Sequence, residues 1–167
     1  MMKYRLTEKI GSGGMASKLA AAKIATWSGV EAVIADASRE GVLGSVIKGS
    51  IGVGTRFRPR ERRLPARKLW IAFAIGASGT VVVDEGARRA LVERGTSLLP
   101  AGVVSAGGEF GPDDAVEIIG PDGAVFAKGL VRHPSSQIRS WAGRRTSDLP
   151  ENLSHEVVHR DDLVVLG

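Results

Sequence analysis

The sequence has no cysteine and few aromatic residues. Disulfide bonds and thiolate metal sites are therefore excluded, and a chain without cysteine fits the reducing cytoplasm. Phe, Trp and Tyr together make up 5% of the residues, so a core must be built from Val, Leu, Ile and Ala. The longest apolar runs, such as residues 69–75, are far shorter than the about 20 residues of a membrane-spanning helix. The first residues also lack the apolar stretch of a signal peptide. We therefore expect a cytoplasmic protein with no membrane contact.

Length and composition indicate a globular protein. The 167 residues suffice for one ordinary domain or two small ones, and 43% of them are hydrophobic while 25% are charged. The net charge of +5 arises from residues 56–68, where six arginines and one lysine stand against Glu61 alone. Such a run is typical of a surface that binds a polyanion, either RNA or a nucleotide. It is also typical of a solvated linker, which we favour because Pro59 and Pro65 interrupt the run.

The first part of the chain predicts a helix followed by a strand. A glycine-rich turn at residues 11–14 leads into a helical segment at residues 15–28, which Gly29 is suited to end. Residues 30–35 predict a short strand, and residues 41–48 a turn or a short helix. We interpret residues 38–68, which hold several glycines, two prolines and the basic run, as the end of a first unit and a linker.

The predicted helix carries apolar residues on two opposite faces. They are Met15, Leu19 and Ala22 on one face, and Ala20, Ile24 and Trp27 on the other. A helix that is apolar on two sides needs cover on two sides. One helix and one strand cannot supply that cover, so we expect it to come from further parts of a layered α/β domain or from another copy of the chain.

From residue 69 onward the pattern predicts many short strands. The expected strands lie at residues 69–75, 80–83, 102–106, 116–119, 124–130, 157–158 and 163–166. A strong turn signal, Gly-Pro-Asp-Gly at residues 120–123, joins two of them into a hairpin. Short helices are expected at residues 87–94, with Leu91 and Val92 facing inward, and at residues 135–141. Short strands with evenly spaced turns are typical of a small barrel.

The glycine-rich segment at residues 11–18 is the most informative local feature. Glycines let the backbone approach an anion, and a helix that begins directly after them presents free N–H groups and the positive end of its dipole. Lys18, one turn into the helix, could then reach a phosphate. The segment lacks the Gly-Lys-Ser/Thr ending of a Walker A loop and the Gly-x-Gly-x-x-Gly pattern. By itself it is also compatible with a plain chain reversal.

The order of motifs in the second half resembles a PUA domain. An acidic-Gly-Ala helix start within residues 80–87 is followed by Leu-Pro-Ala-Gly within residues 97–103, and then by residues 108–110 and 127–130. PUA domains are compact pseudo-barrels that bind RNA in RNA-modifying enzymes. The resemblance therefore implies a β-rich pseudo-barrel and makes RNA a candidate partner.

Taken together, the two halves resemble the glutamate 5-kinases. That family carries Gly-Thr-Gly-Gly-Met-x-Thr-Lys-Leu-x-Ala-Ala late in its amino-acid-kinase domain, and residues 11–22 match it, with Ser12 and Ser17 in place of the threonines. Further family segments follow in order at residues 54–59, 67–71, 83–87, 97–102 and 159–163. The match runs from Gly11 to the end of the chain.

The resemblance implies an α+β chain: a fragment of an α/β amino-acid-kinase domain at residues 1–54, a basic linker and first strand at 55–78, and a PUA domain with a C-terminal tail at 79–167. The family transfers a phosphoryl group from ATP to L-glutamate, with magnesium, in the first step of proline biosynthesis. The residues that would lie against the ATP phosphates are Ser12, Gly13, Gly14, Met15, Ala16, Ser17 and Lys18.

The family's other phosphate-binding, glutamate-binding and catalytic groups precede this segment, so no complete catalytic set is expected in this chain. We expect a truncated gene product, a late start or an excised piece, with little or no kinase activity alone, and a homo-oligomer as in the family. A free-standing PUA-type RNA-binding module is the alternative function.

The remaining polar candidates have structural interpretations. His133, His155 and His159 lack metal-ligand spacing, so no metal site is expected. The acidic pairs at residues 113–114 and 161–162 are explained by loops and strand ends. Asp84 and Glu85 stand where a helix N-terminus favours acidic residues. Trp70 and Trp141 are expected in the core or at an interface.

Overall fold

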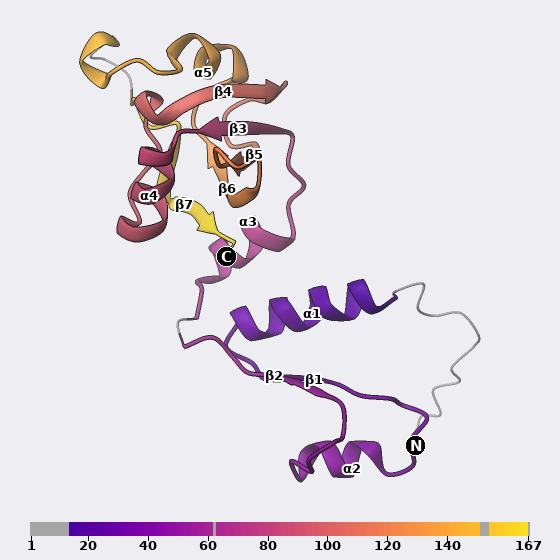
Figure 1. The fold of residues 1–167 in the computed structure, drawn as a ribbon. Coiled ribbons are helices and arrows are strands. Elements are labelled where there is room, and N and C mark those ends of the chain that lie inside the picture. Colours follow the sequence, from indigo (N-terminus) through magenta and orange to yellow (C-terminus); the bar gives the residue numbers. More distant parts are fainter. Residues whose placement is uncertain (1–13, 62, 151–153, 167) are drawn as a thin grey trace. The chain divides into compact units, whose positions relative to one another are not determined.

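The computed structural model describes residues 14–61, 63–150 and 154–166, and the chain forms two compact units that divide between Pro65 and Ala66 (Figure 1). Most of the predicted glycine-rich turn at residues 11–14 lies outside the described residues. No helix within the described residues is long and apolar enough to cross a membrane.

The first unit consists of two helices and a two-stranded sheet. The order is α1 (Met15–Trp27), β1 (Ala32–Ile34), α2 (Val42–Ile47) and β2 (Thr55–Phe57). The strands pair antiparallel with Ala32 opposite Phe57, and α1 packs against β1. Beyond the last turn of α1, Gly29 takes a left-handed conformation with φ of 79°, which glycine adopts without steric cost. The predicted helix, strand and short second helix of this part are confirmed.

Helix α1 is covered on part of each predicted apolar face. Ala22 and Trp27 are buried, with 2% of Trp27 exposed, whereas Met15, Leu19 and Ile24 remain exposed. The guanidinium of Arg60 lies 3.9 Å from the centre of the Trp27 ring and covers it. The first unit therefore covers the Trp27 side chain by itself. The apolar area that α1 leaves exposed is smaller than the sequence predicts.

The second unit is built around a five-stranded sheet. Its strands are β3 (Gly79–Val83), β4 (Val103–Gly108), β5 (Ala115–Ile119), β6 (Val125–Val131) and β7 (Val158–Val165). The order across the sheet is β4-β3-β5-β6-β7, with β3 and β5 parallel and every other neighbouring pair antiparallel. Helices α3 (Ala66–Phe73), α4 (Glu85–Arg94) and α5 (Ser135–Trp141) and the 3-10 turns η1 (Pro100–Gly102) and η2 (Thr146–Asp148) complete the unit.

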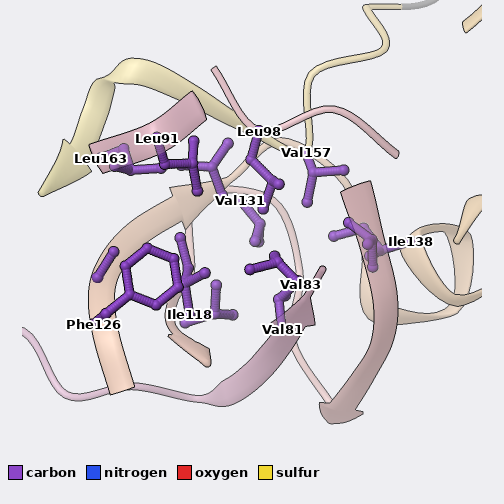
Figure 2. Close-up of a cluster of buried hydrophobic side chains, with 14 of the residues drawn as sticks. Val81, Val83, Leu91, Leu98, Ile118, Phe126, Val131, Ile138, Val157 and Leu163 are labelled. Carbon is purple, nitrogen blue, oxygen red and sulfur yellow. The ribbon is translucent and has the colours of Figure 1, made fainter. Parts of the chain in front are cut away.

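The core of the second unit is aliphatic, as the low aromatic content requires. Figure 2 shows Val81 and Val83 of β3 facing Ile118 of β5, with Leu91 of α4 and Ile138 of α5 closing the cluster. Burying each such side chain contributes roughly 1.5–3 kcal/mol relative to exposure. The strands expected at residues 80–83, 102–106, 116–119 and 124–130 and the helices expected at residues 87–94 and 135–141 are confirmed. The two strands expected at residues 157–158 and 163–166 form one strand, β7.

Two predictions for this unit are wrong. Residues 69–75 were expected to form a strand, but they belong largely to helix α3. A short apolar run does not distinguish a buried strand from a helix by period alone, and α3 buries Ile71 fully while Trp70 stays 47% exposed. Val92 was expected to face inward with Leu91, yet it is 51% exposed. Consecutive residues of a helix lie about 100° apart, so only one of the two can face the core.

Hydrogen bonds to residues of β6 and β7 attach helix α3 to the rest of the second unit. Arg67 Nε donates to Asp162 Oδ1 at 2.6 Å, and Lys68 Nζ donates to the Arg160 carbonyl at 3.0 Å. Lys128, a largely buried lysine of β6, donates to the Ile75 carbonyl just beyond the end of α3. With Ile71 buried beneath them, these contacts make α3 an integral part of the unit.

Candidate functional site

The start of α1 carries the predicted phosphate-binding residues. Gly14 is the N-cap, in an extended conformation and without a side-chain cap. Its carbonyl accepts hydrogen bonds from the Ser17 amide at 3.1 Å and the Ser17 hydroxyl at 2.9 Å. The first N–H groups of a helix lack partners within the helix and give this end a partial positive charge. Ser12 and Gly13, which the family resemblance includes in the site, lie outside the described residues.

Lys18 borders a cavity of about 610 Å³ in the first unit. The cavity lies between α1, the chain that follows β1 and the segment that leads into β2. Its lining consists of Met15, Lys18, Leu19, Ile34, Ala35, Asp36, Arg39, Val42, Gly52, Val53, Gly54, Thr55 and Phe57. The structure thus brings Met15 and Lys18 to the cavity, while Gly14, Ala16 and Ser17 do not line it.

The cavity combines cationic and apolar surfaces. Lys18 and Arg39 supply two positive charges, and Leu19, Ile34 and Phe57 supply apolar area. An anionic molecule with a flat apolar part is the kind of ligand that such a lining fits. Cationic side chains and a helix N-terminus suit phosphate oxygens, and the apolar side chains suit a base.

Asp36 is the single carboxylate among the lining residues. It accepts hydrogen bonds from the Ser38 amide at 3.0 Å and from the Ser38 hydroxyl at 2.8 Å. These bonds, and to a smaller degree the charge of Lys18, hold the pKa of Asp36 below its ordinary value. The carboxylate is therefore ionised at neutral pH and is already held in place by its neighbour.

A glycine makes the wall of the cavity possible. Gly54 has a φ of 83°, and a Cβ atom there would lie 2.3 Å from the carbonyl oxygen of Ile34. Only glycine lets the chain entering β2 pass so close to the end of β1.

The sequence did not predict that Asp36 and Arg39 line the cavity. No local motif marks either residue, because both reach the cavity only through the pairing of β1 with β2.

The basic run at residues 56–68 is divided between the two units and largely engaged. Arg56 pairs with Glu31 and donates to the Val46 carbonyl at 3.2 Å. Arg60 covers Trp27, while Arg67 and Lys68 attach α3 to β7. Arg62 lies outside the described residues. The run therefore serves largely as structural contacts, and its ends belong to β2 and α3, so it differs from the solvated linker that was expected.

The second unit holds a smaller cavity of about 440 Å³ beside α4. It lies between α4 and the segment at residues 96–102, and its polar lining residues are Asp84, Arg94, Thr96 and Ser97. Asp84 caps α4, because its carboxylate accepts a hydrogen bond from the Ala87 amide at 2.7 Å. This confirms the expected position of Asp84 at a helix N-terminus.

The other polar candidates have local partners. His133 and His155 flank the buried Trp141 ring edge-on at 4.7 and 6.1 Å, and each contacts a backbone carbonyl. Among residues 14–61, 63–150 and 154–166, no three histidine or acidic side chains come together as a metal site would require. Trp141 is a core residue, as expected, whereas Trp70 is not.

Comparison with known proteins assigns the second unit. Residues 79–153 match the family model of the PUA domain. Among solved structures, a PUA domain from Aeropyrum pernix in complex with tartrate is 26% identical, covers 57% of this chain and 49% of its own, and has a TM-score of 0.40. A PUA domain protein from Thermoplasma acidophilum is 15% identical, with 66% and 85% covered and a TM-score of 0.37. The match to the family model thus covers most of the second unit.

Proteins named glutamate 5-kinase match nearly the whole chain. It is 45% identical over 161 residues to the glutamate 5-kinase of Myxococcus xanthus, which covers 94% of this chain and 42% of that protein. The glutamate 5-kinase of Moorella thermoacetica is 42% identical over 160 residues, with 93% and 42% covered. The chain is therefore a relative of the glutamate 5-kinases over nearly its whole length, and it spans about 42% of theirs. The resemblance found from the motifs is confirmed.

Proposed function

We propose that this chain forms the Lys18 side of the nucleotide site, together with the PUA domain, of a glutamate 5-kinase. The reaction is transfer of the γ-phosphoryl group of ATP to the side-chain carboxylate of L-glutamate, which yields L-glutamyl 5-phosphate and ADP. The observation that carries the proposal is the 610 Å³ cavity bordered by Lys18 and the start of α1, in a chain whose relatives bear this name. The absence of cysteine supports a cytoplasmic location.

The chemistry of the site fits the demands of phosphoryl transfer. The transferred group gains negative charge on its outer oxygens, and catalysis consists chiefly of positioning and of charges fixed in advance. Lys18 stands one turn from the positive end of α1, where an ammonium group and free N–H groups can stabilise that charge together.

The lining residues do not form a magnesium site. Asp36 is their single carboxylate and is bonded to Ser38. Magnesium would therefore arrive with the phosphates of ATP, as it does in many kinases, where it neutralises charge on the phosphate oxygens.

The activity test uses the chain by itself and the chain joined to the part of the M. xanthus kinase that it does not match. ADP release is measured with ATP and magnesium, with and without L-glutamate. We expect no glutamate-dependent release from the chain alone, because a partial site cannot position both substrates. The joined protein is expected to show it and to lose it in Lys18→Met. Turnover by the chain alone would contradict the first expectation, and full activity of the joined Lys18→Met protein would contradict the role of Lys18.

RNA binding by the PUA domain is the second candidate function. The observation that favours it is the 440 Å³ cavity beside α4 with Arg94 at its edge, in a unit that matches the PUA family. Fluorescence anisotropy with a labelled single-stranded RNA at several salt concentrations tests it. Most cations of residues 56–68 are engaged, so we expect weak binding. In a plot of the logarithm of the binding constant against the logarithm of the salt concentration, the slope should be negative by roughly 0.7 per phosphate contact. Absence of binding at low salt would exclude this candidate.

A further inference from the structure

We propose that Arg39 is a second polyphosphate-binding residue. It binds the same phosphate chain as Lys18, from a different wall of the cavity. The inference rests on the proposed nucleotide site and adds a residue to it. Lys18 comes from α1, whereas Arg39 comes from the exposed turn between β1 and α2. Both line the 610 Å³ cavity, so one ligand in that space can contact both cations.

The charges around Arg39 leave it available for an anion. Its guanidinium has five N–H donors, and the described residues offer it one acceptor, the Gly52 carbonyl at 3.5 Å. None of the carboxylates in the described part of the chain forms an ion pair with it. Glu40, its neighbour in sequence, is exposed and forms no ion pair with it in the described part of the chain. Asp36, the carboxylate that lines the cavity, accepts hydrogen bonds from Ser38 instead.

Another arginine of the same unit provides the contrast. The guanidinium of Arg56 is held by Glu31 and by the Val46 carbonyl, and Arg56 does not line the cavity. An arginine at the rim of a cavity, exposed and without a carboxylate partner, is instead placed to accept a ligand. A planar guanidinium matches two phosphate oxygens at once, while an ammonium acts as a point charge.

The arrangement assigns separate parts of the cavity to separate parts of a nucleotide. Lys18 and Arg39 bind phosphates, and the apolar side chains of Leu19, Ile34 and Phe57 receive the base. Affinity should therefore rise from adenosine to AMP, ADP and ATP, with Arg39 contributing only where phosphates are present.

NMR titration of the ¹⁵N-labelled chain with adenosine, AMP, ADP and ATP measures each Kd, at low salt and in EDTA. Arg39→Gln is compared with Arg58→Gln, which removes an equal charge from an exposed arginine outside the cavity. We expect Arg39→Gln to weaken ATP binding by about 10-fold or more, the usual effect of losing a charged hydrogen bond. Adenosine binding should change less than twofold, and Arg58→Gln should match the wild type for every ligand.

The conservative variant separates charge from geometry. Arg39→Lys keeps the charge but loses the paired donors, so it should recover only part of the lost ATP affinity. Equal ATP affinities of Arg39→Gln and Arg58→Gln, alongside a loss in Lys18→Met, would overturn the role of Arg39 and leave the nucleotide site standing. Failure of the wild-type chain to bind ATP at all would overturn both proposals. Unchanged amide spectra of each free variant verify its fold.

Discussion

At the scale of single residues, close backbone packing is the clearest constraint in the second unit. A Cβ atom on Gly102 would lie 2.4 Å from the Cβ of Ala87, on the first turns of α4. The Asp84 amide donates to the Gly102 carbonyl at 3.0 Å, which fixes the distance between the two segments. The glycine of the Leu-Pro-Ala-Gly motif is thus explained by contact with the helix that follows β3.

Gly102→Ala should destabilise the second unit by about 1–3 kcal/mol, because the added methyl group forces α4 and η1 apart. Urea unfolding followed by circular dichroism measures the change. Gly76→Ala is the matched control, since a Cβ there meets nothing within 4 Å and its φ is not in the left-handed region. A similar loss of stability in both variants would show that the Gly102 contact is not the cause.

The sequence predicted some residues of the candidate site and not others. Lys18 could be singled out because a glycine-rich turn before a helix is recognisable locally. Asp36 and Arg39 reach the cavity only because β1 and β2 pair and bring the turns at their ends beside α1. No short pattern encodes that pairing, so their place in the site follows from tertiary structure alone.

At the scale of elements, the turn signals were more reliable than the apolar runs. The hairpin between β5 and β6 was predicted because Gly-Pro-Asp-Gly specifies a tight turn, and the Gly120 amide bonds to the Ala124 carbonyl at 3.0 Å. Helix α3 was predicted as a strand because its apolar run is too short to show a period. Its helical state is stabilised by Asp162 and Lys128, which lie far away in the sequence.

Helix α3 should be needed for the stability of the second unit. A chain of residues 66–167 is expected to unfold cooperatively, whereas residues 79–167, which lack the fully buried Ile71 and its tethers, should be less stable or molten. Thermal melting by near- and far-UV circular dichroism compares the two.

A point substitution checks the same idea without truncation. Ile71→Ala in residues 66–167 should cost about 2–5 kcal/mol, and Trp70→Ala, at a half-exposed neighbour, should cost clearly less. Equal stability of the 66–167 and 79–167 chains would show that α3 is an appendage of the fold.

At the scale of the whole molecule, the first unit leaves apolar side chains uncovered. Met15, Leu19 and Ile24 of α1 are exposed, as are Leu43, Ile47 and Ile51 around α2. Surfaces of this kind commonly mark an interface. The sequence predicted exposed apolar side chains on α1, although it could not show that Arg60 covers Trp27.

The chain is therefore expected to self-associate through the first unit. Sedimentation velocity over a concentration series should show dimers or larger species, because burying each aliphatic side chain contributes roughly 1.5–3 kcal/mol. Leu19→Asp, at a 45% exposed position, should shift the distribution toward monomer. Val92→Asp, at a 51% exposed site in the second unit, is the control and should not. A wild-type chain that stays monomeric at high concentration would contradict the expectation.

The tethering of α3 also bears on how this protein could exchange parts during evolution. The matched PUA pattern begins at Gly79, yet the compact unit begins at Ala66 and depends on the helix in between. A gene rearrangement that joined a new partner at the codon of Gly79 would remove Arg67 from Asp162 and the Ile75 carbonyl from Lys128, while one at Ala66 would keep both contacts. The unit that a gene fusion would have to transfer intact, residues 66–167, is thus longer than the match to the family model, residues 79–153. Fusions should be tolerated best at the boundary after Pro65.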